Sequence, residues 1–440
     1  MTHLRVPAVS TLSRAIVCAM LATTGATPIV AARSLAPMAR GVPSDRVGGV
    51  AASQAPLVAV ALRGDIYAVP ADGSALPHRL TAYGHNNSPA LSPHGRLIAY
   101  LSAPRAALRA VGFPTSHNVW IVPVDGASDG SSAYKLTPTN LQVDRGGPAW
   151  APDGQHLAYI EYNQSRSSAS VVVVDYQGTH RIVVLRTTGA MAGTISWSPD
   201  SRRIAVAPIQ ATAAGALPLH IVSTNGGAGT LITVRFPTGS LGQADNSTPT
   251  AVGSFPNPNG LSWAPDGRHL VVETFGAGEG GHLTGLWRVA DSGGVAQLFV
   301  GTPGGVRRNS YSAGPYSFLS SASSFAYSPD GRSLLINSSG SGFWLANADG
   351  AQGHLLSPAP RACCALVQSV WLTDSSGLAF VTLQVLNPPS GSSSSSGPPI
   401  RARLYSRGLN GTSHLLYQLT DPDQGKMEIA PAFNCVVCGG

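Results

Sequence analysis

The residues best placed for chemistry are two cysteines close to the C-terminus. Cys435 and Cys438 form a C-x-x-C motif, which is found in redox pairs, metal half-sites and disulfides. Because the chain begins with a segment typical of exported proteins, described below, we expect a disulfide between them. Cys363 and Cys364 are adjacent in the sequence, which leaves a strained vicinal disulfide and two separate thiols equally open.

Two other patterns match enzyme signatures without the structural context that those signatures need. Residues 126–130 read G-x-S-x-G, and residues 276–281 read G-x-G-x-x-G. A nucleophile elbow lies between a strand and a helix, and a dinucleotide-binding loop opens a helix. The surrounding residues predict a turn followed by a strand for the first pattern, and a loop between two strands for the second. The histidines and carboxylates also lack zinc or calcium spacing, so the sequence predicts no catalytic residue, metal or cofactor.

The chain is dominated instead by an internal repeat. Six segments share an aromatic or apolar residue, a turn that usually reads Pro-Asp-Gly, and an apolar run; they begin at Leu91, Trp150, Trp197, Trp263, Tyr327 and Trp371. Proline and glycine favour a tight turn, and the apolar run favours a strand, so each copy predicts a β-hairpin. The recurring turn aspartates are then structural rather than catalytic: Asp153, Asp200, Asp266 and Asp330.

A second series of hairpins follows the first along the chain. An aromatic or apolar residue, such as Trp120 or Trp287, lies six positions before a turn residue that is always glycine, and a short strand follows. The two hairpins make a four-stranded antiparallel unit, whose strands we call A, B, C and D. All seven tryptophans fall in A or C strands, which indicates packing within and between units rather than ligand stacking.

The two series differ in number, and the difference predicts how the fold closes. The second series has seven members and the first has six, because the hairpin at 66–80 has no A strand before it. Residues 430–433 (APAF) resemble residues 147–150 (GPAW), which end an A strand. We therefore predict an all-β fold, a β-propeller of seven blades, closed by pairing of residues 429–433 with the strand near 57–62. Closure removes free sheet edges; six blades, with the first hairpin outside the ring, is the alternative.

The repeat resembles that of TolB-type β-propellers. The likeness is carried by the W-[SA]-P-D-G-x-x-[LI]-A units and by the hairpin that follows each of them, and it covers residues 57–440. The resemblance implies a β-propeller fold and does not specify a function. TolB itself has six blades and an additional N-terminal α/β domain, whereas this sequence predicts seven blades and no such domain.

The N-terminal segment and the charge distribution bear on location and partners. Arg5 and Arg14 precede an apolar stretch, and residues 30–32 resemble a signal-peptidase site. We expect residues 1–32 to be a signal peptide, with an uncleaved anchor as the alternative, residues 33–56 a flexible linker and residues 57–440 the propeller. The mature chain is then extracytoplasmic: secreted, on the cell surface or periplasmic. The net charge of +7 is dispersed, so we expect no nucleic-acid partner, no membrane span after signal removal, and a monomer.

Binding residues are expected on the long D–A and B–C connections, which emerge on the same face of an antiparallel propeller. The candidates, of types favoured in binding sites, are Arg307, Arg308, Tyr311 and Tyr316 in one connection and Asp144 and Arg145 in another. The expected function is an exported, non-catalytic scaffold that binds an unidentified protein or extracellular ligand. The alternative is an extracytoplasmic propeller enzyme, a lyase or hydrolase acting on glycans or peptides at the channel mouth. The propeller of a prolyl-oligopeptidase-like peptidase is a third reading.

The same topology constrains cysteine pairing. Cys435 and Cys438 follow the closing A strand, on the face of the short turns, whereas Cys363 and Cys364 lie in a D–A connection on the opposite face. Four or five strand residues separate the faces by roughly 15 Å. A disulfide requires Cα atoms within about 7 Å. We therefore expect no bridge between the two pairs.

Overall fold

The computed structural model describes part of the chain: residues 55–103, 117–138, 142–144, 147–163, 168–188, 193–208, 216–235, 250–251, 260–278, 281–300, 323–338, 342–358, 366–385, 400–421 and 427–429. The chain divides into two units, Met1–Ala52 and Ser53–Gly440, and every described residue belongs to the second. The described residues form strands and their connections. Among them there is no helix of the length and hydropathy needed to cross a membrane.

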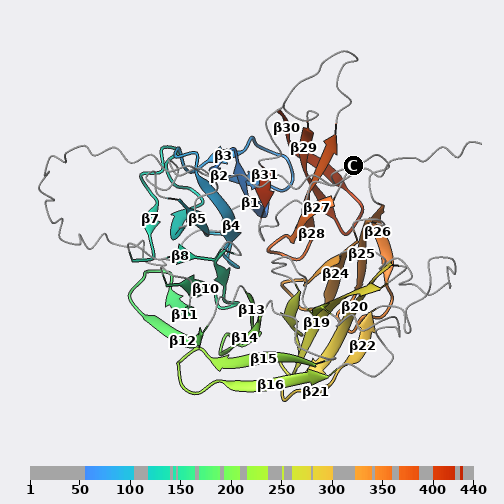
Figure 1. Cartoon of the computed structure of the whole chain (residues 1–440). Helices are drawn as coiled ribbons and strands as arrows, with labels where there is room; N and C mark the ends of the chain where they lie inside the picture. Colours follow the sequence, from blue (N-terminus) through green and yellow to red (C-terminus); the bar gives the residue numbers. More distant parts are fainter. Residues whose placement is uncertain are drawn as a thin grey trace, which may run out of the picture. The chain divides into compact units, whose positions relative to one another are not determined.

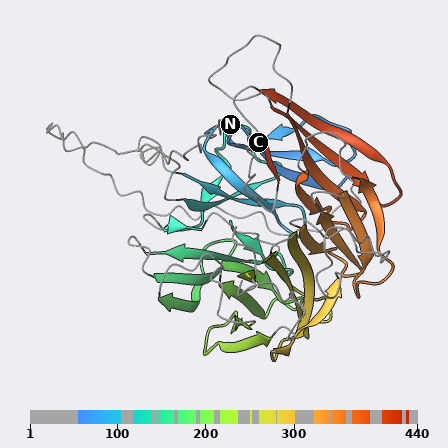
Figure 2. The ribbon, with the colours of Figure 1, turned by 45° about the vertical axis from the view of Figure 1, so that its right-hand side comes forward.

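Seven separate sheets make up the second unit, each built on four consecutive strand positions, and they follow one another as the blades of a β-propeller (Figures 1 and 2). From the inner strand outwards, blade 1 contains β31 (Met427–Ile429), β1 (Leu57–Leu62), β2 (Asp65–Pro70) and β3 (His78–Arg79). Blade 2 contains β4 (Asn86–Leu91), β5 (Leu97–Ser102), β6 (Asn118–Pro123) and β7 (Tyr134–Lys135). Blade 3 contains β8 (Gln142–Val143) with β9 (Ala149–Trp150), then β10 (His156–Tyr162), β11 (Ser168–Asp175) and β12 (Arg181–Thr188).

The remaining four blades continue the order. Blade 4 contains β13 (Gly193–Trp197), β14 (Arg203–Pro208), β15 (Ala216–Ser223) and β16 (Thr230–Arg235), to which β21 (Gly294–Val295) adds in parallel. Blade 5 contains β17 (Thr250–Ala251) with β18 (Leu261–Trp263), then β19 (His269–Gly278), β20 (Gly281–Ala290) and β22 (Gln297–Val300). Blade 6 contains β23 (Ser323–Tyr327), β24 (Ser333–Ser338), β25 (Gly342–Asn347) and β26 (His354–Pro358). Blade 7 contains β27 (Leu366–Trp371), β28 (Gly377–Val385), β29 (Ile400–Gly408) and β30 (Ser413–Asp421).

The predicted closure of the ring is confirmed. β31 pairs antiparallel with β1, with Ile429 opposite Val60 and Met427 opposite Leu62. The N-terminal hairpin is therefore part of blade 1, and the alternative of six blades is wrong. Residues 430–433, which we also expected in this strand, lie outside the described part of the chain.

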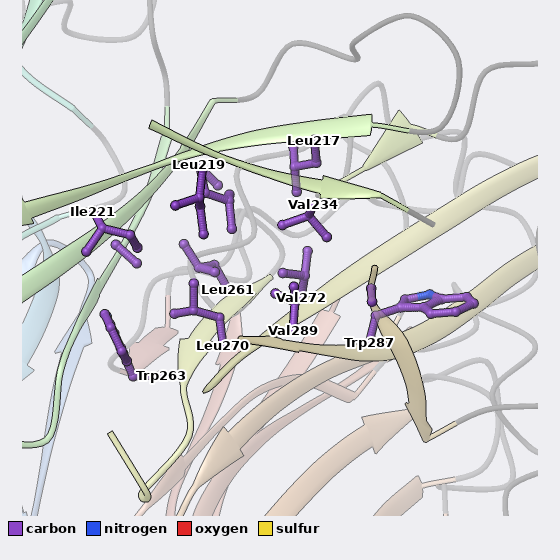
Figure 3. Close-up of a cluster of buried hydrophobic side chains, with 14 residues drawn as sticks. Leu217, Leu219, Ile221, Val234, Leu261, Trp263, Leu270, Val272, Trp287 and Val289 are labelled. Atoms are coloured by element: carbon purple, nitrogen blue, oxygen red, sulfur yellow. The ribbon is translucent and has the colours of Figure 1, made fainter. Parts of the chain in front are cut away.

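The hydrophobic core lies between neighbouring blades. Strand residues alternate between the two faces of each sheet, so each blade contributes one apolar row to each neighbour. The largest cluster joins blades 4 and 5 and includes Leu219 and Val234 from one and Leu270 and Trp287 from the other, all nearly inaccessible to solvent (Figure 3). Repetition of such clusters around the ring holds the inner strands at fixed positions around the centre.

The two apparent enzyme signatures have structural roles. Residues 126–130 lie in the turn region between β6 and β7. Residues 276–278 end β19 and Gly281 begins β20, with Gly278 opposite Gly281, so the paired strands extend into the region predicted as a loop. Neither pattern meets a helix in the described structure.

Candidate functional site

A cavity of about 680 Å³ lies at the centre of the ring and is the candidate functional site. Its wall contains residues from all seven blades, among them Val58, Ser88, Trp150, Trp197, Trp263, Tyr327 and Trp371. We call it the channel. Its volume is in the range of small-molecule and peptide-binding pockets.

The channel has one end at the A–B turns, where its wall includes Ser328, Asp330 and Thr373, and another towards Ser88. At the end of the A–B turns, the wall contains the turn prolines Pro93, Pro152, Pro199, Pro265 and Pro329. The other end begins where Ser88 reaches the wall from β4, three residues before Leu91. Ser88 belongs to a set of hydrogen-bonded polar side chains at the junction of blades 2 and 3, and it is the member of that set that lines the cavity wall.

Ser88 occupies an irregular position in β4. The pairing with β5 passes from Asn87 opposite Leu101 directly to Ala90 opposite Ala99, so Ser88 and Pro89 form a bulge. The φ angle of Ser88 is +50°, a conformation that a residue with a side chain adopts at a cost. The residue is only 6% exposed. Backbone strain of this kind clusters at functional sites.

Asn87 connects Ser88 to a buried histidine. The Ser88 hydroxyl donates to Asn87 Oδ1 at 3.2 Å, and Asn87 Nδ2 lies 3.5 Å from His117 Nε2. Because the amide nitrogen is a donor, Nε2 accepts here in the tautomer of His117 that carries its proton on Nδ1. His117 immediately precedes β6 and is 3% exposed, and its backbone oxygen accepts from the Val143 amide.

Blade 3 adds an acidic residue and a phenol beside this set. Tyr162 donates its hydroxyl to Asp144 Oδ2 at 2.8 Å, and the Asp144 amide donates to the oxygen of Ile160. The turn that starts at Asp144 ends at Gly147, where a Cβ atom would lie 3.0 Å from that of Ser88. We call Asn87, Ser88, His117, Asp144 and Tyr162 the polar cluster. Hydroxyl, imidazole, carboxylate and phenol groups are the types that serve as acids, bases and oxyanion donors.

The described residues place only part of the predicted site. Asp144 lies between β8 and β9 and belongs to the polar cluster. The other predicted ligand-binding residues lie outside the described part of the chain: Arg145, Arg307, Arg308, Tyr311 and Tyr316. The same holds for Cys363, Cys364, Cys435 and Cys438, so their pairing stays a prediction. Among the described residues, no group of three or more His, Cys, Asp and Glu side chains could hold a metal ion.

Sequence reasoning missed four members of the polar cluster: Asn87, Ser88, His117 and Tyr162. A signal for Ser88 was present, because residues 88–91 align with residues 147–150 in the repeat. The glycine at the equivalent position, Gly147, has a φ of +80°. Comparing the copies residue by residue would have predicted a strained serine at the channel wall. No comparable signal marks His117, whose place depends on the path of a B–C connection.

Comparison with known proteins gives one sequence match and several structural likenesses. No protein-family model matches the chain. A protein described as "Probable dipeptidyl-peptidase 5" from Aspergillus terreus is 29% identical over 127 residues, which are 28% of this chain and 17% of the relative. The match therefore spans less than a fifth of that relative's length.

Solved structures with a partial likeness to this chain include the following three. An oligogalacturonate lyase in complex with manganese has a TM-score of 0.48, with 12% identity over 72% of this chain and 79% of that one. The β-propeller domain of the Trilobed protease from Pyrococcus furiosus has a TM-score of 0.45, with 12% identity over 82% and 89%. A putative TolB from Agrobacterium tumefaciens has a TM-score of 0.36, with 17% identity over 68% and 92%. All three TM-scores are below 0.5, so these likenesses carry no argument about this chain.

The expected function is corrected by these comparisons. The sequence predicted a non-catalytic binding scaffold rather than an enzyme, and this is wrong: the curated relative is a peptidase, which points to the alternative, a propeller enzyme. The physical reason is that the W-S-P-D-G repeat stabilises blades and takes no part in chemistry, so binding and catalytic propellers share it. The absence of a familiar catalytic motif therefore could not separate the two classes.

Proposed function

We propose that this chain is an extracytoplasmic propeller enzyme that acts on peptides, with its substrate bound in the channel. The observation that carries the proposal is the sequence match to a dipeptidyl-peptidase. The channel supports it, because a cavity of about 680 Å³ can hold a short peptide. Activity, substrate and partners are taken here as proposals, since the match covers 17% of the relative.

The polar cluster supplies groups that amide hydrolysis can use. Hydrolysis needs a base that takes a proton from the attacking nucleophile and donors that stabilise the developing oxyanion. The cluster contains the imidazole of His117 and the carboxylate of Asp144, whereas the hydroxyl protons of Tyr162 and Ser88 are donated to Asp144 and Asn87 within the cluster. The apolar walls contributed by Trp150, Trp197 and Trp371 would contact substrate side chains.

Location belongs to the same proposal. We propose that residues 1–32 are removed on export, that the mature chain acts outside the cytoplasm as a monomer, and that it binds no nucleic acid. The order of basic, apolar and small residues in this segment supports it. Amino-terminal sequencing of the native protein should start near residue 33, and an intact Met1 on cytoplasmic material would contradict this part.

A substrate panel tests the activity. The secreted chain is assayed with dipeptidyl and aminoacyl coumarin amides and, in parallel, with oligogalacturonate. We expect release of coumarin from the peptide substrates, and we expect this activity to be lost in His117→Ala and retained in Ser131→Ala, an exposed turn residue. The pair of variants separates intrinsic activity from a contaminating peptidase. Cleavage of the glycan alone, or of no substrate, contradicts the proposal.

A further inference from the structure

Blade 7 carries positive charge on β29, the strand that lies between β28 and β30 (Figure 1). We propose that Arg401 and Arg403 of this strand form a binding site for an oxyanion, a carboxylate or phosphate group, on the face of blade 7 that is turned towards blade 6. This site is independent of the activity proposed above. We call the two residues the arginine pair.

The alternation of side chains along β29 places the arginine pair on one face of the sheet, together with Tyr405. Ala402 and Leu404, on the opposite face, are buried and pack against blade 1. Tyr405 packs against the cluster that joins blades 6 and 7. The arginine pair is therefore turned towards blade 6, and its two Cα atoms are about 7 Å apart along the strand.

Blade 6 is too short to cover this end of blade 7 with a strand. Trp344 and Tyr405 are equivalent in the repeat, because each lies six positions before a turn glycine. Strand β25 begins at Gly342, two residues before Trp344, whereas β29 begins five residues before Tyr405. Arg403 is therefore level with the first residue of β25, and Arg401 lies beyond it. Both arginines are half-buried and keep part of their surface in contact with solvent.

The arginine pair has no carboxylate partner among the described residues. Arg403 Nε donates to the neutral amide oxygen of Gln418 at 2.8 Å. The Nε atom of Arg401 is buried and meets no acceptor in the described part of the chain. Arginines of blades 1, 3, 4 and 5 each lie within 2.7 Å of a carboxylate oxygen: Arg79, Arg181, Arg203 and Arg288.

This arrangement costs free energy that an anion would return. Because its Nε is buried, the side chain of Arg401 lies against the protein instead of extending into water. Arg403, which Gln418 holds in place, carries a charge of the same sign two residues away, and like charges repel. Water satisfies N–H groups but leaves the charge uncompensated. An oxyanion does both, and the planar guanidinium matches carboxylate and phosphate oxygens in bidentate pairs.

The residues opposite the arginine pair on β28 are donors as well. Gln384 lies opposite Arg401, and Thr382 lies opposite Arg403. Residues directly opposite each other in an antiparallel sheet share a face. An amide and a hydroxyl both donate hydrogen bonds and carry no charge. These four side chains therefore offer donors and two positive charges, which fits an anion and disfavours a cation.

Thermal denaturation with small anions tests the site. Sodium phosphate and sodium succinate are compared with sodium chloride at pH 7 and equal ionic strength, because a ligand that binds only the folded state raises the Tm. We expect at least one of the two oxyanions to raise the Tm of the parent above its value in chloride, and an effect of only one of them identifies the preferred group. Equal Tm values in all three salts would overturn the proposal.

Two variants with the same change in charge locate the effect. We expect Arg401→Gln to lose at least half of the oxyanion shift and Arg235→Gln, at an exposed position on β16, to keep it. In chloride, Arg401→Gln should be at least as stable as the parent, because it removes a repulsion and no ion pair. Equal oxyanion shifts in the two variants would show that the anion acts on the net charge alone, which overturns the site.

Isothermal titration calorimetry with the stabilising anion gives the stoichiometry. We expect one anion for each parent chain, with the affinity at least fivefold lower in Arg401→Gln and in Arg403→Gln and within twofold of the parent in Arg235→Gln. An affinity that is unchanged in both variants of the arginine pair would overturn the assignment of the site to β29.

Discussion

The junction between blades 4 and 5 is held together differently from three other junctions of the ring. Between blades 2 and 3, 3 and 4, and 6 and 7, a tryptophan indole N–H donates across the gap to a backbone oxygen. The pairs are Trp150 with Ala90 at 2.9 Å, Trp197 with Ala149 at 3.1 Å and Trp371 with Ala326 at 3.0 Å. In each pair the acceptor is an alanine that directly precedes the last A-strand residue of the preceding blade.

At the junction of blades 4 and 5 that alanine is replaced by Ser196. Its hydroxyl accepts from the backbone amide of Trp263 at 2.9 Å. The indole N–H of Trp263 is buried and has no acceptor among the described residues. The Arg203 guanidinium lies 4.5 Å from the centre of the Trp263 ring and also bonds Asp291 and the oxygen of Gly267, at 2.7 and 2.9 Å. The tryptophan at this repeat position thus stabilises the propeller in two ways. Its indole N–H donates a hydrogen bond in three blades, and the face of its indole contacts a guanidinium in blade 5.

The largest expected effect is at Arg203. Arg203→Ala removes the cation–π contact, the ion pair with Asp291 and the bond to Gly267 at once. With a discount for partial exposure, we expect a loss of about 2 kcal/mol in the free energy of unfolding. Urea denaturation measures it, with the exposed neighbour Arg202→Ala as the control. Equal midpoints for the two variants would show that the ring face of Trp263 does not hold this junction.

A smaller difference in stability is expected between variants of Trp197 and Trp263, which occupy the same repeat position in blades 4 and 5. Trp197→Phe removes an indole donor that is bonded, and Trp263→Phe removes one that is not. We expect Trp197→Phe to destabilise the protein by about 1 kcal/mol more than Trp263→Phe, because only the first loses a hydrogen bond. Both variants are measured in the same urea titration. A larger loss in Trp263→Phe would contradict the comparison.

Low pH should reduce the stability of the folded protein through protonation of Asp266 in blade 5. Burial alone would raise the pKa of Asp266, but hydrogen bonds from the Arg268 amide, His269 and Arg288 lower it to about 2, from 3.8. The stabilisation is present above pH 4, where the carboxylate is charged in both states, and is lost as the pH falls towards 2. We expect the Tm gap between the parent and Asp266→Asn to narrow over this interval. A gap that stays constant from pH 5 to pH 2 would contradict the assignment.

The smallest effect is expected at the turn serines. Ser375→Gly relieves a positive φ but removes the bond from Asp330. The two contributions are similar in size and opposite in sign, so we expect a change within about 0.5 kcal/mol. Ser375→Ala keeps the strain and loses the bond, and it should cost about 1 kcal/mol. The order of the two variants in thermal denaturation checks that the hydroxyl offsets the strain.

The fold was predictable because its determinants are local and repeated. The turn after Trp150 and the turn after Trp263 each combine Pro, Asp and Gly, and they reappear at the same place in each blade. Closure of the propeller was predictable as well, because the hairpin at 66–80 has no A strand before it and the segment at 430–433 resembles one.

The polar cluster was not predictable in the same way. The cluster depends on the position of His117 at the start of β6. It also depends on the hydrogen bond from the Val143 amide to the backbone oxygen of His117, two residues that are 26 positions apart in the sequence. Such contacts are tertiary and leave no periodic signal. The different roles of Trp197 and Trp263 were hidden for a related reason, since they depend on whether Ala149 or Ser196 stands in the preceding blade.

Hydrogen–deuterium exchange with a bound peptide tests most directly whether the substrate occupies the channel beside the polar cluster. The secreted chain is measured with and without a hydrolysis-resistant dipeptide analogue at saturating concentration. We predict slower exchange in the segments that carry the cluster, residues 86–91, 117–123 and 142–150, and unchanged exchange in the outer strands β12 and β30. Protection confined to outer strands, or no protection in these three segments when the analogue is bound, would contradict the account.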